Sequence, residues 1–101
     1  MEIDKHITEV VFRVEQHKDY KGQIFALLPY EISSGYYVTC YSTNEGHASA
    51  NYKSCIANSK VASKQEYENL YNQMTQLGYN LKVVDRQVYN KYLKAYYNSN
   101  I

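Results

Sequence analysis

Tryptophan is absent from this sequence of 101 residues, and proline (one), cysteine (two) and glycine (four) are scarce. So little proline and glycine excludes collagen-like and low-complexity chains, and two cysteines cannot build a framework of several disulfides. No hydrophobic run approaches the roughly 18 residues that a membrane-spanning helix requires, so we expect no membrane partner. Neither sign of charge dominates, because 11 Lys and Arg stand against 10 Asp and Glu. A nucleic-acid partner is disfavoured, since such proteins carry dense basic clusters.

A secretory signal is also lacking. The first nine residues, MEIDKHITE, are acidic and polar, whereas a signal peptide needs a basic start followed by an apolar stretch. We therefore expect a cytoplasmic protein in which the thiols of Cys40 and Cys55 are reduced. His47 lies between these cysteines, but their spacing matches no common zinc pattern. The sequence predicts no metal site and no cofactor.

The residue that the chain does contain in abundance is tyrosine, at 13 positions. Tyrosine combines apolar area with a hydroxyl group, which suits half-buried sheets and binding surfaces equally. A base-composition bias of the coding sequence explains the same abundance, and the sequence leaves both explanations open. With 45% hydrophobic and 21% charged residues, the composition is that of a globular protein. The length predicts a single domain over residues 1–101.

The segment 63–86 carries the clearest structural signal. Ser63 and Glu66 are spaced as a capping box at the start of a helix, and Gly78 stands where a helix commonly ends. After Gly78, the alternation over residues 81–84 is typical of a strand. Apolar residues recur at helical spacing between the two ends: Tyr67, Leu70, Tyr71, Met74 and Leu77.

Three strands are predicted before this unit. Residues 8–15 alternate between apolar and polar types, as a strand with one buried face does. The apolar run 23–28 fits a central strand, which Pro29 should end because proline cannot donate a ladder hydrogen bond. Residues 36–41 are rich in β-forming types. The three strands together predict an antiparallel meander.

Between these strands and the helix the periodicity disappears. We expect an irregular and functional loop over residues 42–62, in which residues 52–57 could add a short strand. Residues 87–97 predict a second helix, and residues 98–101 are expected to fray. The predicted order is β-β-β-(β)-α-β-α, an α+β fold with a small antiparallel sheet and helices packed on one face.

The segment 42–62 also holds most of the predicted ligand site. Gly46 permits close backbone approach, and His47 can donate or accept a hydrogen bond near neutral pH. Hydroxyl groups, tyrosine rings that stack on a planar ligand and cations that neutralise a phosphate complete the set: Ser42, Thr43, Ser49, Tyr41, Tyr52, Arg13 and Lys60. The alternative, a loop whose small residues only turn the chain, stays open.

No catalytic residue is predicted. His47 and Ser49 are two positions apart, a spacing that seldom gives the geometry of a nucleophile and its base. The sequence contains no GxSxG, HExxH or phosphate-binding P-loop motif. We therefore expect a non-enzymatic protein.

The second half of the chain is mildly basic. Residues 51–101 hold seven Lys and Arg against three Asp and Glu, whereas residues 1–50 hold four against seven. Arg86, Lys91 and Lys94 are expected along the predicted last helix. This face is either only solvated or binds a partner protein.

Five short segments can be compared with known families: VFR at 11–13, IFALLP at 24–29, Tyr41 with GHAS at 46–49, VASKQEY at 61–67 and GYNLKV at 78–83. In these segments the chain resembles an uncharacterised family of small hypothetical proteins found in phages and mobile elements. The likeness covers most of residues 9–86. Members often carry a Tyr-x-His-x-Gly-x-His run, whereas here Thr43 stands at the first His position and Glu45 precedes Gly46. This departure argues against a role that needs two histidines, such as a metal site.

The resemblance implies an accessory binding protein, including one that counters a host defence. The first hypothesis is a non-enzymatic module that binds a small phosphorylated or nucleotide-like ligand, as a homo-oligomer. The alternative is a protein-interaction module that inhibits a host protein through a tyrosine-rich sheet face or the basic carboxy-terminal helix.

Overall fold

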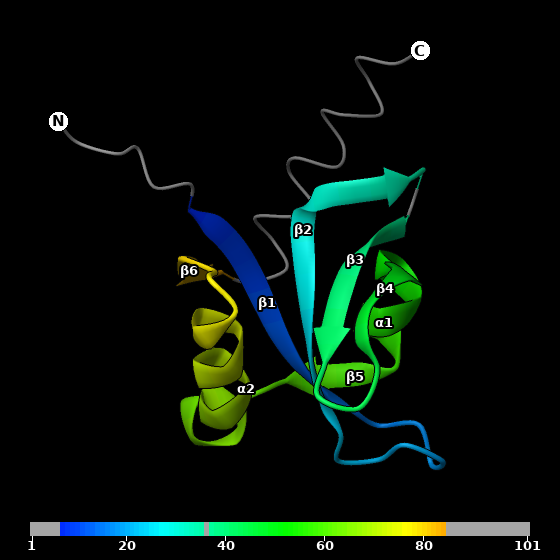
Figure 1. Ribbon diagram of the computed structural model, residues 1–101. Helices are drawn as coiled ribbons and strands as arrows, with labels where there is room; N and C mark the ends of the chain where they lie inside the picture. Colours follow the sequence, from blue (N-terminus) through cyan, green and yellow to red (C-terminus); the bar gives the residue numbers. More distant parts are fainter. Residues whose placement is uncertain (1–6, 36, 85–101) are drawn as a thin grey trace, which may run out of the picture.

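The computed structural model describes residues 7–35 and 37–84 and shows a sheet with helices beside it (Figure 1). The described strands form one six-stranded sheet with the order β4-β3-β2-β1-β5, and β6 also pairs with β1. The expected α+β class is confirmed, while the predicted helix over residues 87–97 lies outside the described residues. The elements are β1 (Thr8–Glu15), β2 (Ile24–Ser34), β3 (Tyr37–Ser42), β4 (Gly46–Asn51), α1 (Tyr52–Ala57), β5 (Ser59–Val61), α2 (Lys64–Gln76) and β6 (Leu81–Val83).

The strands β1 to β4 form an antiparallel meander, which confirms the prediction for the first three. Leu27 of β2 lies opposite Val11 of β1 and Cys40 of β3. The β3–β4 hairpin places Tyr41 opposite His47. Within the described residues, β4 pairs with β3 alone and is an edge strand of the sheet.

The central strand β1 has a second edge that two short strands share. β5 runs antiparallel along its carboxy-terminal half, with Val61 opposite Arg13. β6 runs parallel along its amino-terminal half, with Val83 opposite Val10. A tight turn cannot join two parallel strands, and β6 follows β1 only after β2 to β4, α1, β5 and α2, with α2 linking β5 to β6 (Figure 1).

The helix α2 covers one face of the sheet. Its buried Leu70 and Met74 belong to the same apolar cluster as Phe12 of β1. The rings of Phe12 and Tyr67 stack with their centroids 4.4 Å apart, an arrangement worth about 0.5–1.5 kcal/mol beyond the area it buries. The predicted apolar stripe therefore faces the core as far as Met74, while Leu77 is 56% exposed.

The short helix α1 covers the opposite face, where Tyr52 and Ile56 pack in a second cluster with Val11 and Leu27. The two described helices therefore lie on opposite faces of the sheet. The expectation of helices on one face concerned α2 and the predicted helix over residues 87–97, which lies outside the described residues. Because α1 packs on the face of the sheet opposite α2, the second face of β1 is also buried. Val11 is 3% exposed and Arg13 is 5% exposed, so the prediction of a single buried face is wrong.

The segment 42–62 is regular, and the prediction of an irregular loop is wrong. Residues GHASAN form β4 although small residues have low strand propensity, because each of them pairs with a residue of β3. Residues 52–57 form α1 and not the suggested strand. Asn51 caps this helix, since its side chain accepts a hydrogen bond of 3.0 Å from the backbone N–H of Ser54.

The strand β2 continues past Pro29, where the sequence predicted its end. Leu28 lies opposite Thr39, but the next paired residue, Ile32, lies opposite Val38. Pro29 therefore sits in a bulge of the ladder, where a missing N–H is tolerated. Figure 1 shows β2 bending along its length.

The ends of α2 match the sequence signals. The Ser63 hydroxyl accepts a hydrogen bond of 3.2 Å from the backbone N–H of Glu66, and the Glu66 carboxylate accepts one of 2.8 Å from the backbone N–H of Ser63. Gly78 follows with a φ of +108°, a conformation that side chains disfavour. No helix within residues 7–35 and 37–84 is long and apolar enough to cross a membrane.

Candidate functional site

A hollow of about 300 Å³ opens between the β1–β2 loop, the β3–β4 hairpin and α1. This volume is at the lower end of the range for small-ligand sites. Residues 48–50 of β4 form part of its wall. We call it the thiol cavity because the thiols of Cys40 and Cys55 line it. Its other polar lining residues include Glu15, Tyr20, Ser42 and Glu45.

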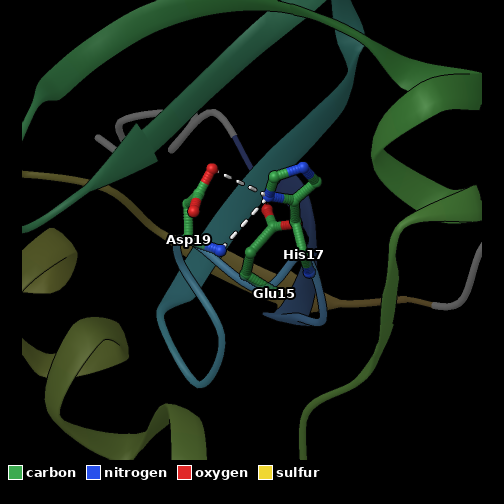
Figure 2. Close-up of polar contacts among 3 residues, drawn as sticks. All are labelled: Glu15, His17 and Asp19. Atoms are coloured by element: carbon green, nitrogen blue, oxygen red, sulfur yellow. Dashed lines mark hydrogen bonds and ion pairs between the residues drawn. The ribbon is translucent and has the colours of Figure 1, made fainter.

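The β1–β2 loop is folded onto the end of β1, which positions one acidic wall of the cavity. The Glu15 carboxylate accepts a hydrogen bond of 3.1 Å from the backbone N–H of His17. Figure 2 shows Asp19 approaching His17 Nδ1 with both its backbone N–H, at 3.3 Å, and its carboxylate, at 3.7 Å. The backbone N–H of Tyr20 donates to the carbonyl of His17 at 2.9 Å. The loop therefore holds Glu15 and Tyr20 beside the cavity.

The two thiols of the cavity are protonated at neutral pH. Partial burial, followed by the charge of Glu45, raises the pKa of the Cys40 thiol. Partial burial, followed by the electrostatic effects of Cys40 and Glu15, raises the pKa of the Cys55 thiol to about 11. Since the thiolate is the nucleophilic form of cysteine, both side chains act here as small, weakly polar groups.

The charge of the cavity is negative. Glu15 and Glu45 line it, and none of its described lining residues is Lys, Arg or His. Tyr20, Gln23 and Ser42 add hydroxyl and amide groups. Carboxylates surrounded by hydrogen-bonding groups and an apolar floor suit a ligand with a cationic or hydrogen-donating end.

Several predicted site residues gather on the opposite face of the β3–β4 hairpin. The rings of Tyr41 and His47 lie with centroids 4.8 Å apart, and His47 Nε2 lies 2.7 Å from the Tyr79 hydroxyl. Partial burial and the charge of Glu31 raise the pKa of Tyr79, so its hydroxyl is intact at neutral pH. The Thr43 hydroxyl donates a 2.8 Å hydrogen bond to the Gln73 side chain of α2. These contacts tie the hairpin to α2 and to the residues that follow it.

Arg13 lies on the α1 face and holds the end of that helix. Its guanidinium donates hydrogen bonds to the Ile56 carbonyl at 3.2 Å, to the Ser59 carbonyl at 2.7 Å and to the Ser59 hydroxyl at 2.9 Å. The last carbonyls of a helix have no partner within the helix, and Arg13 supplies one. The predicted contact of Arg13 with a phosphate stays a prediction beside this structural role.

The remaining predicted residues are dispersed. Ser42 lines the thiol cavity, whereas the ring of Tyr52 is 1% exposed and fills the core beneath α1. Ser49 also lines the thiol cavity, and its hydroxyl lies 2.5 Å from the Ser33 hydroxyl. Lys60 is exposed on β5 opposite Val14 and does not line the cavity. Gly46, with a φ of +69°, begins β4 after the hairpin turn.

Three further predicted residues, Arg86, Lys91 and Lys94, lie outside the described residues. Cys40, His47 and Cys55, whose spacing matches no common zinc pattern, form another set that the structure divides. The hairpin register separates that set, because Cys40 belongs to the cluster beneath α1 while His47 contacts Tyr41 of the α2-side cluster.

Sequence reasoning missed the acidic and thiol side chains that line the cavity. The signal that could have found them is the hairpin register. A strand at 46–51 that pairs with 37–42 places Cys40 and Ala48 on one face, next to the helix that carries Cys55. Because β4 was not predicted, nothing in the sequence indicated that Cys40 and Cys55 lie near each other.

A second hollow of about 340 Å³ lies between α2 and β6, beside Tyr67, Tyr71 and Val83. The Tyr67 ring already stacks on Phe12, and the Tyr71 ring lies tilted against both Phe12 and Tyr67. None of its described lining residues was predicted to bind the ligand, so it is the weaker candidate.

Comparisons of the chain with protein-family models, with curated proteins and with solved structures gave no match.

Proposed function

We propose that this protein is a non-enzymatic binding protein whose ligand enters the thiol cavity with a cationic or hydrogen-donating group. The observation that carries the proposal is the composition of the cavity wall. Glu15 and Glu45 face a hollow of about 300 Å³ that has no basic group among its described lining residues. A primary amine or guanidinium gains charge-assisted hydrogen bonds from such a wall.

The absence of an activated nucleophile at the cavity supports binding over covalent chemistry. A catalytic cysteine requires a lowered pKa, whereas the pKa values of Cys40 and Cys55 are both raised. In the cavity these thiols serve as an adaptable, weakly polar floor.

The phosphorylated or nucleotide-like ligand predicted from the sequence stays a prediction, and we do not assign it to the thiol cavity. A phosphate in the thiol cavity would meet two carboxylates and gain no cationic partner from the lining residues. The accessory role in a phage or mobile element, with inhibition of a host protein as the alternative mode, likewise stays a prediction of the sequence resemblance.

The test is a titration followed by amide chemical shifts in NMR, with agmatine as the cationic probe and adenosine monophosphate as the anionic probe. We expect agmatine to shift the amides of Ala48 and Ala50 and of the loop around Tyr20. Glu15→Gln combined with Glu45→Gln should weaken agmatine binding about tenfold or more, because two charge-assisted contacts are lost. The matched control is Glu68→Gln on α2, which lines the second hollow and not the thiol cavity and should leave the affinity for the thiol cavity unchanged.

Two results would overturn the proposal. One is an equal agmatine affinity in the wild type and in the double variant, which removes the carboxylates from recognition. The other is adenosine monophosphate binding at these same amides while agmatine does not bind, which reverses the inferred charge of the ligand.

A further inference from the structure

Among the strands that the structure describes, β4 leaves one edge unpaired and without the usual protection against further pairing. Within the described residues it pairs with β3 alone, and its sequence GHASAN contains no Lys, Arg, Asp, Glu or Pro. Natural edge strands are commonly blunted by charges, prolines or bulges. The opposite edge of the sheet follows this rule, because β5 and β6 are only three residues long and carry Lys60 and Lys82. The register of β3 with β4 is continuous, without a bulge.

We propose that two copies of this chain associate by antiparallel pairing of β4 with β4. A twofold axis through Ser49 makes the strand self-complementary. Ser49 then lies opposite its own equivalent, and His47 lies opposite Asn51 of the second copy. Ala48 lies opposite Ala50 of the second copy, so that small apolar side chains meet on the α1 face. Cross-strand neighbours of these kinds are compatible, and no like charges face each other within the strand.

Charges just outside the strand favour the same arrangement. Glu45 precedes β4 and Lys53 follows it in the second position of α1, and both residues are exposed. Antiparallel pairing centred on Ser49 brings Glu45 of each copy toward Lys53 of the other. A parallel pairing would instead bring like charges together, so the charge pattern selects the antiparallel, closed dimer.

The interface adds one six-residue strand pair to each sheet, which is less contact than stable complexes of standard size use. We therefore expect a reversible dimer whose population depends on concentration. Residues 48–50 line the thiol cavity, so the dimer seam runs along the rim of that cavity. The dimer is independent of any ligand, and its test does not require one.

The first experiment is sedimentation velocity over a concentration series up to about 1 mM, where weak association becomes visible. We expect the wild type to shift from monomer to dimer. Ser49→Lys places two like charges directly opposite each other at the twofold axis and should raise the dissociation constant at least about tenfold. Gln65→Lys, an equal charge change at an exposed position of α2, is the control and should leave the dissociation constant unchanged.

A charge-exchange experiment identifies the register. Glu45→Lys alone gives a copy with two basic residues at this seam, and Lys53→Glu alone gives a copy with two acidic ones, so each variant should dimerise poorly. An equimolar mixture should form heterodimers, because every facing pair is then opposite in charge. Native mass spectrometry with one variant labelled with ¹⁵N distinguishes the heterodimer from both homodimers.

Three outcomes would overturn the inference. The first is a wild type that stays monomeric over the whole concentration range. The second is a dimer that Ser49→Lys leaves intact although this variant is folded by circular dichroism. The third is a mixture of the charge variants that forms heterodimers no better than each variant forms homodimers.

Discussion

At the scale of single residues, the two cysteines show how burial and charge can act together. Cys40 lies on β3 and Cys55 on α1, and each is half-buried at the wall of one cavity. Glu45 raises the pKa of Cys40, and Glu15 raises that of Cys55, in each case as a smaller effect than burial. Neutral thiols tolerate this environment, whereas thiolates would face both partial desolvation and carboxylates.

The raised pKa of Cys55 predicts a loss of stability in alkaline solution. Its folded pKa is about 11, against an ordinary value of 9.0, so the folded state holds its proton more tightly than the unfolded state. The stabilisation is complete below pH 9 and declines as the pH rises toward about 11. We expect the free energy of unfolding of the wild type to fall in this range relative to that of Cys55→Ala.

Urea denaturation of both proteins at a series of pH values measures this difference. Subtraction of the two curves removes the contribution of the tyrosines, which titrate in the same range in both proteins. Parallel curves up to pH 11 would contradict the burial and charge assigned to Cys55.

At the scale of elements, the sequence predicted those that carry their own signals and missed those that depend on neighbours. The helix α2 has a capping box, an apolar stripe and a terminal glycine, and all three were found in the structure. The strand β4 has small residues without strand propensity and forms because β3 pairs with it. The helix α1 has only six residues, too few to be stable alone.

The candidate site could be predicted only in part for the same reason. Ser42 and Ser49 were placed in the site from their residue types and their position in segment 42–62, but the cavity is built by strand register. Register decides which side chains share a face, and it could not be derived for a strand that was not recognised. Glu15 was assigned only to a strand face, because nothing in its own sequence neighbourhood indicates the loop that folds beside it.

The dependence of α1 on Arg13 is testable. Arg13→Ala removes three hydrogen bonds from the end of α1 and from Ser59, and it leaves buried carbonyl groups without this donor. We expect the free energy of unfolding to fall by about 2–4 kcal/mol in urea denaturation. Arg13→Lys keeps the charge but cannot reproduce the planar fork, and should lose part of this amount. A change within about 0.5 kcal/mol for Arg13→Ala would contradict the role.

At the scale of the whole molecule, a single sheet separates two apolar clusters. One cluster joins α2 to the sheet through Leu70 and Met74, and the other joins α1 through Tyr52 and Ile56. The strands β1 to β3 contribute alternate residues to both clusters. Loss of either cluster therefore removes support from the strands that carry the other.

This arrangement predicts cooperative unfolding. Leu70→Ala and Ile56→Ala lie in different clusters, and each should lower the free energy of unfolding by about 2–4 kcal/mol. Both variants should still unfold in one transition that coincides when followed by tyrosine fluorescence and by circular dichroism. The control is Leu77→Ala, whose side chain is 56% exposed and whose loss should change stability by less than about 0.5 kcal/mol. Two separate transitions would show that the clusters are independent.

The edge of β1 that β5 and β6 share is completed late in protein synthesis. β1 is synthesised first, yet its partners on that edge are β5 and β6, at residues 59–61 and 81–83. The β1–β4 meander can assemble from neighbouring segments as they leave the ribosome, because its pairings are local. The second edge of the central strand, however, stays unpaired until residues 59–61 have emerged, and its amino-terminal half stays unpaired until Val83 has emerged. A ribosome that stalls before that point holds a nascent chain with an open sheet edge, the form most exposed to chaperones and to aggregation.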